Sequence, residues 1–198
     1  MFYKIARAIV LFLIRLWFRI EVRGRENLPK EGGYIVIANH QRLIDPIIVT
    51  EAVIVKLSIM AKKELFKYKF LGAAFSSLGA FPVDRGKGDM SAIETAENNL
   101  KNKEVLLIFP EGTRSKTGEL LRFKNGGALV ALETGADVLP VVIDYKNGAR
   151  IFGKIVVSIL PVIKNEELGN GEKSMHAMKN ATRLMQSKVS DELEELRK

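Results

Sequence analysis

A histidine and an aspartate lie within one short polar stretch, residues 39–45, that directly follows an apolar run. On one regular helix, His40 and Asp45 would lie about 140° apart and could not meet. Across a strand-to-helix turn, however, the carboxylate can fold back toward the imidazole. A carboxylate on one ring nitrogen fixes the tautomer and leaves the other nitrogen free as a general base. The pair therefore predicts a catalytic dyad that removes a proton from a substrate.

A structural interpretation of the two residues stays open. Asp45 precedes Pro46, which is the order expected for a helix N-cap followed by proline in the first turn. A single histidine beside a strand is also often structural. The two interpretations of Asp45 are compatible, because one carboxylate can serve both a backbone N–H and an imidazole.

Two arginines stand in polar segments that follow other apolar runs. Arg85 comes after residues 81–83, and Arg114 comes after residues 105–109. A guanidinium can hold a phosphate through two parallel hydrogen bonds, so both arginines are candidate phosphate ligands. A solvated surface charge is the alternative for each of them.

The neighbours of Arg114 could also serve a substrate. Gly112 allows close approach of the backbone, and Thr113 supplies a hydroxyl donor. Glu111 could orient one of the arginines or bond a substrate hydroxyl. The backbone N–H groups around Gly112 are candidate donors to an oxyanion.

Composition excludes several classes of chemistry. The chain has no cysteine and two histidines, so disulfides, thiolate nucleophiles and cysteine-ligated zinc are excluded, and no metal site is predicted. The nucleotide-binding glycine loops and the serine-nucleophile turn are also missing. A net charge of +8 calls for an anionic partner such as phospholipid, an acidic carrier protein or a phosphorylated substrate. Nucleic acid is not expected, since no nucleic-acid-binding motif accompanies the charge.

Apolar runs that alternate with helical patterns must position these residues. Strands are predicted over residues 19–22, 34–38, 57–61, 81–83, 105–109, 138–144 and 154–162, and helices over 45–55, 89–101, 128–134 and 174–197, with short helices between 64 and 78. This order predicts one α/β domain with a largely parallel or mixed central sheet flanked by helices. Ligands of such sheets bind at the carboxyl ends of strands, where the three polar segments would converge.

The first 20 residues predict an amphipathic helix. Its four cations, Lys4, Arg7, Arg15 and Arg19, project within an arc of about 120° on a helix of 100° per residue. Such a helix can lie in the membrane interface with its apolar face buried. The alternative is a first core helix with a basic solvent face. No run is long enough to span a bilayer, so we expect peripheral or monotopic association with the cytoplasmic face of a membrane.

Four segments together resemble the glycerolipid acyltransferase family, specifically the 1-acyl-glycerol-3-phosphate acyltransferases. They are the H-x4-D pattern of His40 to Asp45, residues 79–85, residues 109–115 (FPEGTRS) and residues 138–141 (VLPV), in the family's order and spacing. A further segment, residues 61–65, resembles a family segment whose first lysine is associated with phosphate. The resemblance runs from about residue 22 to 162, with the core motifs in 34–143, and implies an acyltransferase domain over 21–198 after the helix of residues 1–20.

The resemblance implies transfer of a fatty acyl group from acyl-CoA or acyl-carrier protein to the free hydroxyl of 1-acyl-glycerol-3-phosphate, giving phosphatidic acid. His40 and Asp45 would be catalytic, and no cofactor beyond the acyl co-substrate is implied. Substrate would be bound by Lys62, Arg85, Glu111, Gly112, Thr113 and Arg114. Two alternatives stay open: acylation of glycerol 3-phosphate or another lysolipid, and a non-enzymatic module that binds anionic membranes.

Overall fold

A seven-stranded sheet forms the centre of the protein. The computed structural model describes residues 14, 16–67, 79–83, 90–146 and 153–198. The strands are β1 (Arg19–Arg23), β2 (Ile35–Ala38), β3 (Leu57–Lys62), β4 (Ala80–Val83), β5 (Val105–Ile108), β6 (Val138–Tyr145) and β7 (Lys154–Ile159). They lie in the order β1-β7-β6-β2-β5-β3-β4, and every neighbouring pair is parallel except β6 and β7.

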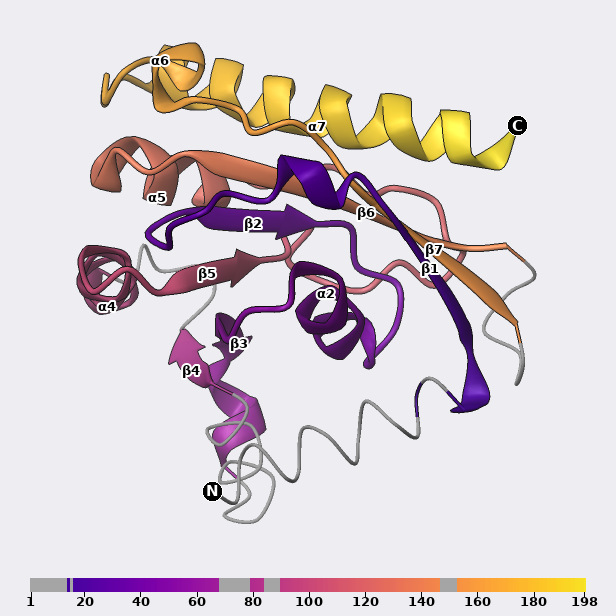
Figure 1. Ribbon diagram of the computed structural model, residues 1–198. Coiled ribbons are helices and arrows are strands. Elements are labelled where there is room, and N and C mark those ends of the chain that lie inside the picture. Colours follow the sequence, from indigo (N-terminus) through magenta and orange to yellow (C-terminus); the bar gives the residue numbers. More distant parts are fainter. Residues whose placement is uncertain (1–13, 15, 68–78, 84–89, 147–152) are drawn as a thin grey trace.

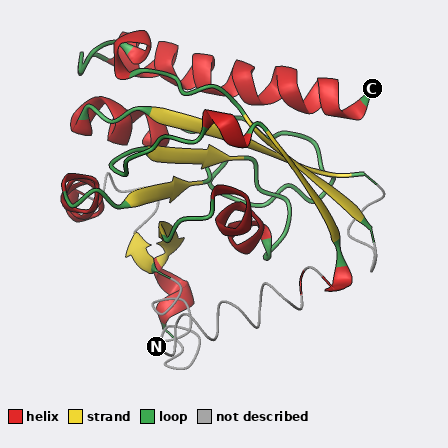
Figure 2. Ribbon diagram, viewed as in Figure 1, coloured by secondary structure: helices red, strands yellow, loops and turns green. Residues whose placement is uncertain are grey.

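Helices cover both faces of this sheet (Figure 1). The α-helices are α2 (Asp45–Val53), α4 (Met90–Lys101), α5 (Gly126–Thr134), α6 (Asn165–Leu168) and α7 (Met175–Arg197). Two short 3-10 helices, η1 (Arg25–Asn27) and η2 (Lys63–Phe66), complete the described elements. Figure 2 shows the helices on either side of the strands. α4, α5, α6 and α7 pack on one face of the sheet, and α2 packs on the other.

The central strands are apolar throughout because both of their faces are covered. In β2, Ile35 and Ile37 contribute to the core on the α5 and α7 side, while Val36 and Ala38 contribute to the core on the α2 side. All four residues are fully buried. Side chains alternate between the two faces of a strand, so a strand covered on both faces reads as an unbroken apolar run. Burial of β2 on both faces therefore explains the continuous apolar run in its sequence.

The predicted fold class is confirmed, and each predicted strand overlaps an observed one. Two short helices, η1 and α6, were not predicted, since three and four residues are too few to show helical periodicity. The predicted N-terminal helix falls largely on residues 1–13 and 15, which lie outside the described residues. Just after them, the side chains of Leu16 and Trp17 are exposed. Within the described part of the chain, no helix combines the length and the apolar character needed to cross a bilayer.

Three adjacent strands present their carboxyl ends at one edge of the sheet. β6, β2 and β5 are neighbours and run in parallel. The loop after β2 carries residues 39–44, the loop after β5 carries residues 109–125, and β6 ends at Tyr145. The convergence of the first and third polar segments that the sequence predicted is therefore confirmed.

Candidate active site

His40 and Asp45 are in direct contact. The Nδ1 atom of His40 lies 2.9 Å from Oδ2 of Asp45. The carboxylate is fully buried, whereas 15% of the His40 side chain is exposed. Asp45 Oδ2 already accepts two backbone N–H bonds, so it acts toward the ring as an acceptor and Nδ1 carries the proton. In the neutral ring this tautomer leaves the other nitrogen, Nε2, as the acceptor, and no described residue bonds to it.

The carboxylate of Asp45 is held by four hydrogen bonds. Oδ2 accepts from the backbone N–H of Gln41 at 2.6 Å and of Arg42 at 2.7 Å, besides the imidazole. Oδ1 accepts from the hydroxyl of Tyr145 at 2.5 Å. Hydrogen bonds to an ionised group are stronger than neutral ones, so the network fixes the carboxylate in the orientation that meets His40.

The predicted N-cap role of Asp45 is wrong. The N-cap of α2 is Ile44, with no side-chain capping bond, and Asp45 is the first residue of the helix. Its carboxylate turns back to the N–H groups of the preceding loop instead of the helix. Pro46 lies in the first turn of the helix, as predicted.

The loop after β5 holds the backbone of His40 on both sides. The N–H of His40 donates to Oε1 of Glu111 at 2.5 Å, and its carbonyl accepts from the N–H of Ser115 at 2.8 Å. The ring of Phe109 stacks on the imidazole, with 4.1 Å between the ring centres and 24° between the planes. The first and third motifs are thus joined into one unit around the imidazole.

Glu111 is a buried carboxylate with two backbone partners. Its Oε2 atom accepts from the N–H of Leu121 at 2.9 Å, and 2% of the residue is exposed. Burial raises its pKa to about 7, against the lowering effect of the two backbone bonds and with a smaller raising effect from the charge of Asp45. These contacts give Glu111 a positioning role for His40. They do not test its predicted contact with substrate.

Asn39 attaches the histidine loop to β6. Its side-chain amide donates to the carbonyl of Ile143 at 2.9 Å, and its Oδ1 accepts from the N–H of Ile143 at 2.7 Å. The side-chain amide of Gln41 donates to the same carbonyl at 3.2 Å. Asn39 is 2% exposed, so this reciprocal pair is shielded from water and sets how the loop leaves the sheet.

The predicted substrate-binding residues of the third motif lie beside this unit. Gly112 has φ +70°, a left-handed conformation that favours glycine. Thr113 and Arg114 are exposed, and no carboxylate of the described residues pairs with Arg114. An atom added at the Cβ position of Gly112 would lie 3.0 Å from the ammonium nitrogen of Lys124. The exposed cations Arg114 and Lys124 therefore both belong to the loop that contains Gly112.

Two of the predicted phosphate ligands are not placed by the structure. Arg85 lies outside the described residues. Lys62 is the last residue of β3, but its side chain is likewise not described. Both remain predictions.

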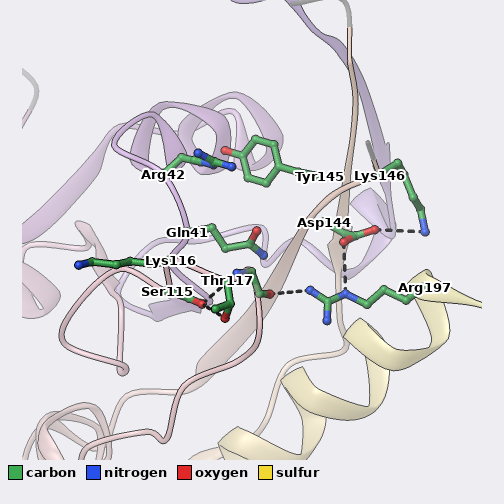
Figure 3. Close-up of a pocket in the computed structure, with 10 residues that line it drawn as sticks. Gln41, Arg42, Ser115, Lys116, Thr117, Asp144, Tyr145, Lys146 and Arg197 are labelled. Carbon is green, nitrogen blue, oxygen red and sulfur yellow. Dashed lines mark hydrogen bonds and ion pairs between the residues drawn. The ribbon is translucent and has the colours of Figure 1, made fainter. Parts of the chain in front are cut away.

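A polar pocket of about 290 Å³, shown in Figure 3, is linked to the His40–Asp45 pair through three of its lining residues. Gln41, which follows His40, and Tyr145, which bonds Asp45, are among its lining residues. Ser115, whose N–H bonds the carbonyl of His40, lines it as well. Figure 3 shows Arg42 beside the ring of Tyr145, with its guanidinium carbon 6.0 Å from the ring centre.

Three positioning residues were missed from the sequence alone. Tyr145 ends an apolar strand and lies 100 positions from its partner Asp45, so no local spacing links the two. Asn39 precedes the H-x4-D pattern, and Phe109 is the first residue of the 109–115 motif. Their positions at these motifs were the only available signal. An imidazole backed by a buried carboxylate is an arrangement that can accept a proton from a hydroxyl.

Comparison with known proteins identifies the family of this chain. Residues 19–144 match the family model described as Acyltransferase. The chain is 32% identical over 154 residues to the 1-acyl-sn-glycerol-3-phosphate acyltransferase of Bacillus subtilis, covering 77% of this chain and 76% of that protein. It is 37% identical to the yeast (Saccharomyces cerevisiae) protein of that name, but it spans only 55% of that protein's length.

A solved structure shares the fold. The crystal structure of the 1-acyl-sn-glycerophosphate acyltransferase PlsC from Thermotoga maritima superposes with a TM-score of 0.72 at 28% identity, covering 98% of this chain and 83% of that one. The resemblance seen in the four sequence motifs is confirmed. The chain belongs to the acyltransferase family.

Proposed function

We propose that the protein transfers a fatty acyl group from a thioester donor to the free hydroxyl of 1-acyl-glycerol-3-phosphate. The observation that supports this most strongly is the contact of 2.9 Å between His40 Nδ1 and the buried carboxylate of Asp45, which leaves Nε2 available as a base. Relatives from Bacillus, yeast and mouse carry the name of this activity. The donor is acyl-CoA or acyl-carrier protein.

In the proposed reaction, Nε2 of His40 removes the proton of the acceptor hydroxyl as its oxygen attacks the thioester carbonyl. The imidazolium that forms is stabilised by the carboxylate of Asp45. When the tetrahedral intermediate collapses, the C–S bond breaks, and the imidazolium returns its proton to the departing thiolate. The new C–O bond completes the ester, and no acyl group is attached to the protein.

The phosphate of the acceptor is held by Arg114, with Arg85 and Lys62 as further ligands, in this proposal. Arg114 is suited to the role because it is exposed and has no carboxylate partner among the described residues. Lys124, beside Gly112, adds a cation that the sequence had not indicated. Arginine binds phosphate through two parallel bonds and lysine through a point charge.

The oxyanion of the intermediate needs hydrogen-bond donors that are fixed in advance. The N–H of Gly112 donates to the carbonyl of Phe109 at 3.0 Å and is therefore engaged in the turn. The N–H groups of Thr113 and Arg114 form no backbone bond within the described residues, so we assign the oxyanion to this pair.

We also propose that the protein acts at the surface of an anionic membrane, as a peripheral or monotopic protein of its cytoplasmic face. The exposed Leu16 and Trp17 support this, since they continue the apolar pattern of residues 1–20 at its carboxyl end. The net charge of +8 favours anionic lipid in the same way.

A panel of acceptors tests the proposed activity. Purified protein receives one labelled acyl donor with 1-acyl-glycerol-3-phosphate, glycerol 3-phosphate or lysophosphatidylcholine, and the labelled products are separated. We expect phosphatidic acid as the main product. Preferred labelling of glycerol 3-phosphate or of the choline lipid would contradict the proposed acceptor, and the absence of any acylated product would contradict acyl transfer itself.

A further inference from the structure

The polar pocket shown in Figure 3 contains a set of cations that the proposed mechanism does not use. Each comes from a different part of the fold: Arg42 from the loop after β2, Lys116 from the loop after β5, Lys146 from the end of β6, and Arg197 from the end of α7. Three of the four are thus delivered by the carboxyl ends of adjacent parallel strands, which is where α/β sheets bind ligands.

The charges in this pocket are only partly neutralised. Asp144 is the one carboxylate in the lining; its Oδ2 lies 3.1 Å from the ammonium of Lys146, and its Oδ1 lies 3.5 Å from Nε of Arg197. Arg197 also donates to the carbonyl of Gly118 at 2.5 Å. Figure 3 shows Asp144 between its two cationic partners.

Arg42 and Lys116 have no carboxylate partner among the described residues, and both are exposed. Asp144 pairs with Lys146 and Arg197, and Glu119, outside the lining, pairs with Arg197 at 3.3 Å. The excess positive charge of the pocket is therefore carried by Arg42 and Lys116. A pocket with excess positive charge raises the local concentration of anions and slows their dissociation.

Uncharged hydrogen-bonding groups complete the lining. The hydroxyls of Ser115 and Thr117 and the amide of Gln41 lie among the cations. Apart from Gly118, every lining residue is polar or charged. A volume of about 290 Å³ is at the lower end for a ligand pocket. It suits a compact polar group and not a fatty acyl chain.

We infer that this pocket is a second phosphate-binding subsite, separate from the Arg114 loop surface, and that it holds a phosphate of one of the two co-substrates. Three lining residues link the pocket to the proposed base and its carboxylate, which supports this. Gln41 follows His40 in the chain, and the N–H of Ser115 donates to the carbonyl of His40. The hydroxyl of Tyr145 donates to Asp45. The inference rests on the proposed function for the identity of the co-substrates. The donor and the acceptor both carry phosphate, so the experiment must separate them.

Binding is measured first, without turnover. Calorimetric titrations with CoA and with glycerol 3-phosphate compare the unaltered protein with an Arg42→Gln/Lys116→Gln double variant. Lys179→Gln is the control, since Lys179 is an exposed lysine of α7 that does not line the pocket. We expect the double variant to bind one of the two ligands at least about tenfold more weakly, which is the loss expected when charge-assisted phosphate contacts are removed.

Steady-state kinetics then show which of the two co-substrates places its phosphate in the pocket. If the donor phosphate occupies the pocket, the double variant raises the KM for acyl-CoA but not for acyl-pantetheine, which has no phosphate. The acceptor has one phosphate, which the proposed function assigns to Arg114. If that phosphate occupies this pocket instead, the KM for 1-acyl-glycerol-3-phosphate rises, that for the donor does not, and the assignment to Arg114 is wrong. Lys116→Arg should retain most of the affinity in either case.

Unchanged affinity of the double variant for both ligands would overturn the inference. An equal loss in the Lys179→Gln control would overturn it as well, because the effect would then reflect total charge. A protein that binds phosphate through Arg42 and Lys116 but transfers no acyl group would refute the proposed function and support the subsite.

Discussion

Replacing Tyr145 with phenylalanine removes one hydroxyl and tests whether the buried carboxylate is positioned as the structure indicates. The hydroxyl donates to Oδ1 of Asp45 at 2.5 Å, and Tyr145 is only 8% exposed. Burial, together with the charge of Asp45 and the bond to it, raises the pKa of Tyr145, so the hydroxyl stays protonated at every pH at which the protein would be assayed. It is therefore a permanent donor to the carboxylate.

The expected loss of stability and activity follows from leaving the buried carboxylate of Asp45 with one donor fewer. A hydrogen bond to an ionised group contributes about 1.5–3 kcal/mol, and Asp45 is fully buried, so water cannot replace the lost donor. In a protein of this size, such a loss lowers the Tm by about 3–12 °C. If the same free energy is lost from the transition state, kcat falls by about 10- to 100-fold at 1.4 kcal/mol per factor of ten. The KM for both substrates should change little, because the hydroxyl is engaged with Asp45 and the variant keeps the ring that lines the pocket.

A matched control separates positioning from simple loss of a tyrosine hydroxyl. Tyr34, at the opposite end of the neighbouring strand β2, is also buried, and its Tyr34→Phe variant keeps the ring. The assay is steady-state acyl transfer at a temperature well below the Tm of each variant. Full activity of Tyr145→Phe would refute the positioning role, as would equal losses of kcat in the two variants.

Three further variants test other parts of the site. Arg114→Ala should raise the KM for the phosphorylated acceptor by about tenfold or more with a smaller change in kcat; an unchanged KM would contradict its role as a phosphate ligand. Asn39→Ala leaves the N–H of Ile143 without its side-chain partner, while the carbonyl keeps the amide of Gln41. The variant should cost about 1–3 kcal/mol in urea-induced unfolding; a loss below about 1 kcal/mol would contradict the anchoring role. Glu111 binds more protons when folded than when unfolded, because its pKa is raised from 4.5 to about 7. Its contribution to stability is therefore complete below pH 4.5 and falls by about 3 kcal/mol as the pH rises to 7. Glu111→Gln should remove this part of the pH dependence of unfolding, and an identical dependence in both proteins would show that the pKa is not raised.

Most of the fold could be predicted because its core strands are covered on both faces. Residues 34–38 and 105–109 are continuous apolar runs, and burial of β2 and β5 between two helical layers explains them. The order of the strands was not predicted, since β2 pairs with β5 and β6, which lie far from it in the chain. Local patterns carry little information about such pairings.

The contact between His40 and Asp45 was predictable, but its surroundings were not. Spacing after a buried strand indicated that Asp45 could meet His40, and the two are in contact. The same spacing also predicted a helix cap, which proved wrong because the N–H groups of Gln41 and Arg42 are closer partners for the carboxylate. The bond from Tyr145 depends on the pairing of β2 with β6, and for that reason it could be seen only in the folded structure.

The central claim is that the imidazole of His40 is the base, and His40→Ala tests it most directly. Both backbone groups of residue 40 are bonded to the loop after β5 through contacts that do not need the side chain, so the variant should fold. The measurement is the rate of acyl transfer to 1-acyl-glycerol-3-phosphate by variant protein whose Tm and circular dichroism match those of a folded chain. We expect a loss of at least about 100-fold, the usual contribution of a general base. A folded His40→Ala protein with near-normal turnover would contradict the account.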